Sequence, residues 1–242
     1  MNIGSTTFGQ TATEAALDVA APIGPQLVRH LRGRIVGADL APGMRLSEQE
    51  IASFYRLSRQ PVREAFIRLA DEGLLEIRPQ RGTFVKHISE AEVMDARFMR
   101  EAIEADLVRA AATNPDRSLI AELRRLVMHQ SATAEGDAAA FLPLDEAFHR
   151  LIADAAGRGR TWSVLQQIKA QMDRVRYLTA VEFPKAKLIA QHTAIVNAIE
   201  SGDIGSAERA MRIHLRKILD DLPAIVAAHP EFFDRHTAQS YD

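Results

Sequence analysis

Four side chains in the C-terminal half of this 242-residue chain have the types and the spacing of metal ligands. Asp145 and His149 are four residues apart, so on a helix they share one face, where an apolar stripe turns them inward. His192 and His214 interrupt the apolar stripes of two further predicted helices in the same way. Each polar group left unsatisfied inside a helical bundle costs about 1 to 3 kcal/mol. A shared partner removes that cost.

A divalent metal suits these four groups. Three neutral imidazoles and one carboxylate from three helices can bind zinc, nickel or manganese and leave positions open for water or a ligand. A lone inward histidine is more often a hydrogen-bonded core residue than a ligand, so the prediction depends on the four residues together. His129 falls outside the stripe of its own helix and is not expected at the site. The ligand set does not specify which metal binds.

A second group of side chains, near the N-terminus, has the chemistry of DNA recognition. Arg59 and Arg63 lie one helical turn apart with Gln60 beside them, while Val62 and its apolar neighbours turn inward. Arginine forms bidentate hydrogen bonds to guanine and glutamine can read adenine in the major groove. Ser58, with the first free backbone N–H groups of the helix, can hold a phosphate.

Three further residues extend this DNA-facing set. Arg81, beside the turn residue Gly82 at the tip of a predicted hairpin, suits a phosphate or a narrow minor groove. Arg45, just ahead of the second predicted helix, is a phosphate candidate. These arginines could instead only keep a surface soluble, but their grouping on a helix and a hairpin favours DNA binding.

Residues 22–88 must position this set, and their pattern predicts a winged helix-turn-helix. Helical apolar spacing over 26–36 ends at a glycine, and a capping box at 47–50 opens a second short helix. Ser58 can cap a third helix that ends at Gly73, followed by a small hairpin of residues 74–77 and 83–85. A generic small α/β domain is the alternative.

The rest of the chain shows helical periodicity with almost no strand signal, so the predicted fold is mainly α. A capping box at 89–92 opens a long helix, and recurring breakers delimit about six helices of an antiparallel bundle. The expected organisation is a flexible tail (1–21), the winged domain (22–88), an all-helical bundle that contains the candidate metal ligands (89–223) and a C-terminal tail (224–242).

Composition narrows the function classes. The chain has no cysteine, which excludes disulfides, a Cys-ligated zinc finger, an iron–sulfur cluster and a cysteine nucleophile. The net charge of −2 hides an asymmetry, since residues 22–88 hold eleven basic and seven acidic side chains, whereas 89–242 hold nineteen and twenty-three. No signal peptide or membrane span is recognisable, so a cytoplasmic location is expected.

Several spaced motifs carry a family resemblance. The segments at 40–52, 57–65, 72–75 and 81–85 make the chain similar to the DNA-binding domain of GntR-type transcription regulators. The segments from Asp145 to His149, at His192 and around His214 resemble the FadR subgroup, whose C-terminal (FCD-type) domain is an all-helical effector-binding bundle. The sequence departs from that pattern at 155–158 and at Gln191, where a possible carboxylate beside the metal site is replaced.

The resemblance implies an effector contact at Arg100, which with Glu104 matches the pattern Arg-x-x-x-Glu of the family's first effector-domain helix. An ordinary ion pair one turn apart is an equal alternative. Asn197 is a weaker candidate for a polar contact in the pocket.

The leading hypothesis is therefore a non-enzymatic, homodimeric regulator, a repressor that binds an inverted-repeat DNA operator. A small carboxylic acid would be its effector, sensed at the metal. The alternatives are a metal-dependent hydrolase with a fused DNA-binding module, and a regulator whose metal is purely structural.

Overall fold

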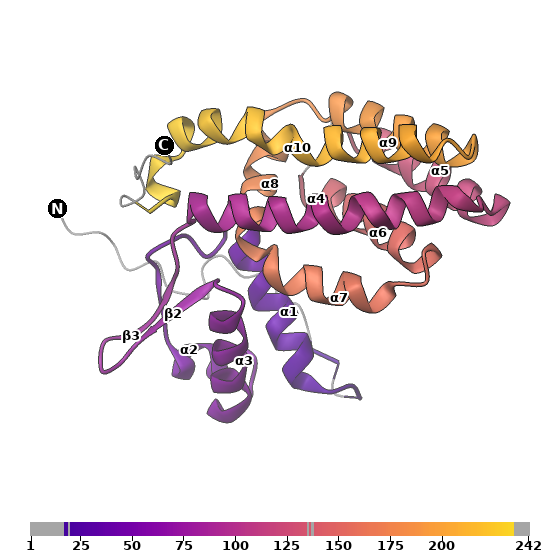
Figure 1. Cartoon of the computed structure of the whole chain (residues 1–242). Coiled ribbons are helices and arrows are strands. Elements are labelled where there is room, and N and C mark those ends of the chain that lie inside the picture. The colour runs from indigo at the N-terminus through magenta and orange to yellow at the C-terminus, as the bar shows by residue number, and fades with distance from the viewer. Residues whose placement is uncertain (1–16, 19, 135, 137, 235–242) are drawn as a thin grey trace. The chain divides into compact units, whose positions relative to one another are not determined.

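The computed structural model describes residues 17–18, 20–134, 136 and 138–234, and the chain divides into two compact units. Unit 1 comprises residues 1–89 and 231–242, and unit 2 comprises residues 90–230 (Figure 1). Most of the predicted N-terminal tail, together with the last eight residues, lies outside the described residues. Each unit has its own apolar core, as expected of two domains.

Unit 1 begins with three short helices, α1 (Ile23–Val36), α2 (Glu48–Phe54) and α3 (Arg59–Asp71). The predicted cap at the start of α2 is present, since the Ser47 hydroxyl accepts a hydrogen bond from the backbone N–H of Glu50 at 3.3 Å. Ser58 precedes α3 in an extended conformation, but its side chain makes no capping hydrogen bond. Helices α1 and α3 pack through fully buried apolar side chains, which leaves the polar face of α3 exposed.

The wing is a three-stranded antiparallel sheet in the order β1-β3-β2. Strands β2 (Leu75–Arg78) and β3 (Gly82–Val85) form the predicted hairpin. The additional strand β1 (Arg45–Leu46) is too short to leave a periodic signal in the sequence. Gly82 has φ of +110°, and a Cβ there would lie 2.8 Å from Nε of Arg45, so the turn requires glycine.

Unit 2 contains helices α4 to α10 within its described residues. Their bounds are α4 (Glu90–Thr113), α5 (Arg117–Ala132), α6 (Ala138–Ala155), α7 (Gly159–Ile168), α8 (Ala170–Glu182), α9 (Ala186–Glu200) and α10 (Ile204–Ala228). The prediction of about six helices missed the break between α7 and α8 at Lys169, where the sequence has neither glycine nor proline. The last helix also continues through Pro223 to Ala228, so residues 224–228 are not part of a tail.

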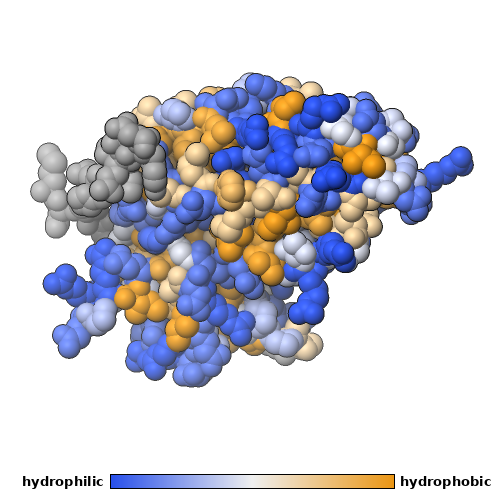
Figure 2. All heavy atoms as spheres, viewed as in Figure 1, coloured by the Kyte–Doolittle hydropathy of each residue, from blue (hydrophilic) through white to orange (hydrophobic). Residues whose placement is uncertain are grey.

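The core of unit 2 is apolar and lies between the long helices. Helix α10 packs against α4 and α9, while α6 packs against α5, α7 and α8. The space-filling view shows hydrophobic residues that interrupt the hydrophilic surface over α4 and α10 (Figure 2), and the exposed apolar side chains there include Phe98 and Ile213. Among the described helices, none combines the length and the uninterrupted apolar sequence of a membrane span.

Candidate metal centre and candidate nucleic-acid interface

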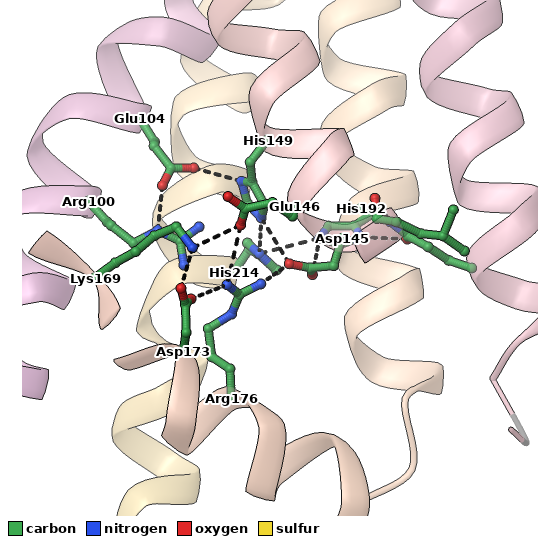
Figure 3. Close-up of polar contacts among 12 residues, drawn as sticks. Arg100, Glu104, Asp145, Glu146, His149, Lys169, Asp173, Arg176, His192 and His214 are labelled. Atoms are coloured by element: carbon green, nitrogen blue, oxygen red, sulfur yellow. Dashed lines mark hydrogen bonds and ion pairs between the residues drawn. The ribbon is translucent and has the colours of Figure 1, made fainter. Parts of the chain in front are cut away.

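The four predicted metal ligands meet inside unit 2. Asp145 and His149 come from α6, His192 from α9 and His214 from α10, and all four are buried. One ligand atom from each lies within 4.8 Å of the other three. Figure 3 shows the three imidazoles pointing toward one another and toward the Asp145 carboxylate. Three helices thus deliver one ligand set to a single point.

The spacing of the imidazole nitrogens fits a metal. Nε2 of His214 lies 3.1 Å from Nε2 of His149 and 3.3 Å from Nε2 of His192. Ligand nitrogens about 2.0–2.1 Å from a tetrahedral ion are separated by about 3.3 Å. Asp145 Oδ1 lies 3.5 Å from Nε2 of His192. Three neutral imidazoles cannot all donate to one another at these distances, and a cation between the nitrogen lone pairs satisfies them together.

The opposite nitrogen of each imidazole faces an oxygen. Nδ1 of His149 lies 2.6 Å from Oε2 of Glu104, and Nδ1 of His192 lies 2.7 Å from the amide oxygen of Gln130. Nδ1 of His214 lies 3.3 Å from the amide oxygen of Gln191. A proton on each Nδ1 satisfies these oxygens and leaves each Nε2 lone pair for a metal.

Burial keeps the ligands in the form that binds metal. Desolvation, with nearby positive charge, lowers the pKa of His192 and His214 well below the usual value of a histidine, so both rings are neutral at neutral pH. Burial by itself would raise the pKa of Glu104, but the positive charge of Arg100 and the contact with His149 outweigh it and lower that pKa. The carboxylate therefore stays ionised beside the site.

A network of buried and half-buried charges lies next to the ligands (Figure 3). Arg176, on α8, contacts Asp145 Oδ2 through Nη2, and its Nη1 lies 2.9 Å from Asp173. Lys169, at the break between α7 and α8, lies 2.9 Å from Glu146 and 2.5 Å from Asp173. Burial and the charge of Arg100 lower the pKa of Arg176 to about 9. The break between α7 and α8 at Lys169 thus contains a buried charge that is paired with carboxylates.

A pocket opens beside the ligand set. Asp145, His214, Arg100 and Arg176 line it, together with apolar side chains of α6, α8, α9 and α10. The ion pair expected for Arg100 is present, since Nε donates to Glu104 at 2.5 Å, while the buried Nη2 has no hydrogen-bond partner among the described residues. Asn197 is not in the pocket wall. It lies exposed on α9, and its side-chain oxygen accepts a hydrogen bond from Arg124.

The DNA-facing residues predicted on α3 are exposed at its start. Arg59 and Arg63 share the carboxylate of Glu48, with Arg59 Nη2 at 2.9 Å and both Nε and Nη2 of Arg63 at 3.1 Å. These contacts lower the pKa of Glu48, with the hydrogen bond from Arg63 as the largest cause. Gln60 donates to Glu64 at 2.9 Å. The two guanidiniums are thereby held side by side on one surface.

The remaining predicted DNA contacts lie at the wing and at the start of α3. Arg45 and Arg81 are exposed, and the guanidinium of Arg45 passes close to Gly82. Ser58 is exposed at the N-terminus of α3. Unit 1 therefore presents cations on a helix start and on the wing.

Several residues of the site were not singled out from the sequence as site residues. They are Glu48 at the DNA-facing surface and Glu104, Gln130, Lys169 and Arg176 around the ligands. Glu104 had a signal, because the stripe of α4 turns it inward together with Arg100. Gln130 carried none, since it is an isolated amide next to the excluded His129.

The fold and the site define a two-part transcriptional regulator, with a DNA-binding domain and an effector domain. The model for "Bacterial regulatory proteins, gntR family" matches residues 24–85, and the model for "FCD domain" matches residues 95–217. The chain belongs to the GntR family and carries an FCD domain. The prediction of a mainly α regulator of this family is confirmed, and because the family consists of transcriptional regulators, the hydrolase alternative is dropped.

Three relatives cover between 76% and 91% of the chain. The "HTH-type transcriptional repressor RspR" of Escherichia coli K12 is 38% identical over 222 residues, which are 91% of this chain and 97% of the relative. An HTH-type regulator of Streptomyces ambofaciens is 40% identical over 84% of this chain and 86% of its own. A "Probable D-xylose utilization operon transcriptional repressor" of Paenarthrobacter nicotinovorans is 32% identical over 76% of this chain and 82% of its own.

Solved structures share the fold. E. coli McbR/YncC has a TM-score of 0.73 at 18% identity and covers 86% of this chain and 99% of its own. A putative GntR regulator from Rhodococcus sp. RHA1 has a TM-score of 0.66 at 23% identity, over 85% of this chain and 98% of its own.

Proposed function

We propose that the protein is a homodimeric repressor that binds an inverted-repeat operator and senses a small carboxylic acid at a divalent metal in unit 2. One observation carries the sensing role. Two of the four convergent ligands, Asp145 and His214, line a pocket that buried Arg100 also lines, and Nη2 of Arg100 has no hydrogen-bond partner among the described residues. The repressor names of two relatives support the sign of regulation.

The metal supplies Lewis acidity and a positive charge at one end of the pocket. Asp145, His149, His192 and His214 would hold zinc, nickel or manganese, and four protein ligands leave room for effector oxygens in a site of higher coordination number. Arg100 Nη2 is a donor for the same anion, and a carboxylate satisfies this buried group. The apolar walls from α6, α8 and α10 then accept the body of the acid.

The DNA-binding role rests on the start of α3 and on the wing. Arg59, Gln60 and Arg63 lie on the exposed face of a helix whose other face is buried against α1, which is the arrangement of a recognition helix. Ser58 and the first N–H groups of α3 face a phosphate. Arg45, with Arg81 and Gly82 at the wing tip, contacts the flanking backbone or the minor groove.

A second copy of this chain is the proposed partner of the face formed by α4 and α10. Phe98 and Ile213 are 65% and 63% exposed on that face. Beside them Glu101 of α4 pairs with Arg212 and Arg216 of α10, so apolar and charged groups of both signs lie together. A two-fold axis can match such a mixed surface with itself. Dimerisation presents two α3 helices to an inverted repeat.

Effector binding changes operator affinity only if the form of the dimer that binds the operator and the form that does not bind it differ in their affinity for the acid. We infer that the regulator acts in the cytoplasm, where operator DNA is accessible. The test is a DNA-binding measurement on purified full-length protein. The protein should prefer its own upstream DNA to random duplex at about 150 mM salt, and one member of a carboxylic-acid panel should change that preference. No preference for that DNA under any condition contradicts the proposal.

A purely structural metal is the second candidate, because the ligands come from three different helices that the ion would join. His149→Ala separates the two candidates. For a structural metal the variant loses thermal stability and keeps the response of the operator complex to the acid. For a sensing metal it loses the response as well.

A further inference from the structure

Arg176 pairs with the carboxylate of Asp145, which is one of the four residues of the ligand set. Its Nη2 donates to Asp145 Oδ2, the same carboxylate that completes the ligand set. The side chain is only 16% exposed and comes from α8, which supplies none of the four ligands. A divalent ion at the three imidazoles would put two positive groups on one carboxylate.

The other neighbours of Arg176 allow it to exchange partners. Its Nη1 lies 2.9 Å from Asp173 Oδ1 and 3.9 Å from Glu146 Oε2, so the guanidinium stays anchored if it leaves Asp145. Arg176 also lines the pocket, as does Arg100. An anion in the pocket therefore meets both guanidiniums, and it offers the unpartnered Nη2 of Arg100 an acceptor.

The charge balance of the site indicates the charge of the ligand that binds together with the metal. Three cations and four carboxylates pair with one another around the ligands, so they carry a net charge of −1 when the imidazoles are neutral and every carboxylate is ionised. The cations are Arg100, Lys169 and Arg176, and the carboxylates are Glu104, Asp145, Glu146 and Asp173. The ion pair of Lys217 and Asp221, also in the pocket wall, adds no net charge. A divalent metal changes the total to +1, which one carboxylate neutralises.

We propose that Arg176 couples the two ligands: it neutralises Asp145 in the metal-free protein, and when metal binds it exchanges Asp145 for the carboxylate of a monoanionic effector. The proposal rests on the metal site proposed above. Metal and acid then bind cooperatively, and the coupling is reciprocal. A dicarboxylate overcompensates the single positive charge, so the favoured class is monocarboxylic acids.

The test uses full-length protein stripped of metal and titrated calorimetrically with Zn²⁺ alone. Arg176→Gln removes the cation that competes for Asp145, so the variant should bind Zn²⁺ about tenfold more tightly than the original protein. Arg150→Gln is the control, because Arg150 is an exposed arginine on the same helix as Asp145, and its Zn²⁺ affinity should stay within about twofold. If the guanidinium only supported the structure, R176Q would bind Zn²⁺ more weakly. Weaker or equal Zn²⁺ binding by R176Q therefore overturns the proposal.

Arg176→Lys keeps a positive charge close to Asp145 and Asp173. The Zn²⁺ affinity of this variant should therefore remain near that of the original protein. An R176K variant that binds Zn²⁺ as tightly as R176Q contradicts the proposed competition between Arg176 and the metal for Asp145.

Formate, the smallest monocarboxylate, tests whether Arg176 exchanges Asp145 for the carboxylate of an effector. At constant ionic strength, replacing chloride by formate should tighten Zn²⁺ binding in the original protein and leave R176Q unchanged.

An equal effect of formate on both proteins, or none on either, overturns the role of Arg176 toward the acid. Failure of the original protein to bind Zn²⁺ removes the metal site itself. That outcome differs from a normal Zn²⁺ site whose affinity R176Q leaves unchanged, so failure of the proposed function and failure of the coupling are distinguishable.

Discussion

Nδ1 of His149 lies 2.6 Å from Oε2 of Glu104, and this contact joins α6 to α4 inside unit 2. Glu104 in turn accepts a hydrogen bond from Nε of Arg100 at 2.5 Å. One carboxylate thus fixes both the ring that faces the metal position and the guanidinium that lines the pocket. A ligand histidine held through its second nitrogen has a fixed orientation and a more basic Nε2.

Replacing Glu104 by glutamine should weaken metal binding by about tenfold or more, because the amide is a poorer acceptor for Nδ1 and no longer balances Arg100. Metal titration of the stripped protein measures the effect. Glu122→Gln on α5 is a matched control, since Glu122 pairs only with exposed Arg125 among the contacts described. Unchanged metal affinity in E104Q would mean that Glu104 does not position the ring.

The sequence predicted the four ligands because each lies in an apolar stripe with helical spacing, and burial follows from that periodicity. It predicted neither Arg176 nor Gln130 as part of the site. Each is a single polar residue whose partner is distant in the chain. Arg176 lies 31 positions from its partner Asp145, and Gln130 lies 62 positions from its partner His192. Such pairs depend on how helices pack. The break at Lys169 escaped prediction for the same reason, since buried ion pairs and not a breaker residue mark it.

At the other unit, local signals were sufficient for the helices and the hairpin. Capping residues, glycines and apolar spacing act within a few positions, and they predicted α1 to α3 and the hairpin of the wing. Strand β1 has two residues and is defined by its pairing with β3, so no local pattern could reveal it. The contact of Glu48 with both arginines of α3 spans 11 and 15 positions and was missed as well.

Replacing Arg59 or Arg63 by alanine should weaken specific operator binding by about 1 to 3 kcal/mol, because each guanidinium can make a bidentate contact to a guanine. Fluorescence anisotropy with the operator and with random duplex measures both affinities. Metal content should remain unchanged, because these residues belong to the other unit. Equal losses on both duplexes would assign these arginines to the phosphate backbone only.

The exposed apolar side chain of Phe98 provides a test of the dimer. Phe98→Glu puts a charge into the proposed interface and should shift the protein from dimer to monomer in analytical ultracentrifugation. Met128→Glu on α5 is the matched control, since Met128 is 61% exposed outside the α4 and α10 face. The control should remain a dimer. A dimeric F98E protein would place the interface elsewhere.

Removing the metal should lower the unfolding temperature. An ion that binds only the folded state adds RT ln(1+[L]/Kd), about 2.7 kcal/mol at a hundredfold excess over Kd, and for a chain of this size that corresponds to roughly 5–10 °C. Differential scanning calorimetry with and without a chelator measures the shift. The His149→Ala variant should show no chelator effect. A shift of equal size in that variant would indicate that the chelator acts elsewhere.

Glu48 is expected to determine how well the DNA-facing surface distinguishes its operator from random DNA. Its carboxylate holds the guanidiniums of Arg59 and Arg63 together, and it also repels the phosphates that non-specific binding requires. Glu48→Gln should therefore raise affinity for random duplex more than affinity for the operator, and it should steepen the dependence of log K on log salt by about one for the random duplex. Asp71→Asn makes the same charge change at the far end of α3 and controls for net charge. If both variants change the two affinities equally, Glu48 contributes only charge. If the ratio of operator to random affinity falls in E48Q alone, the carboxylate positions the two arginines for base recognition.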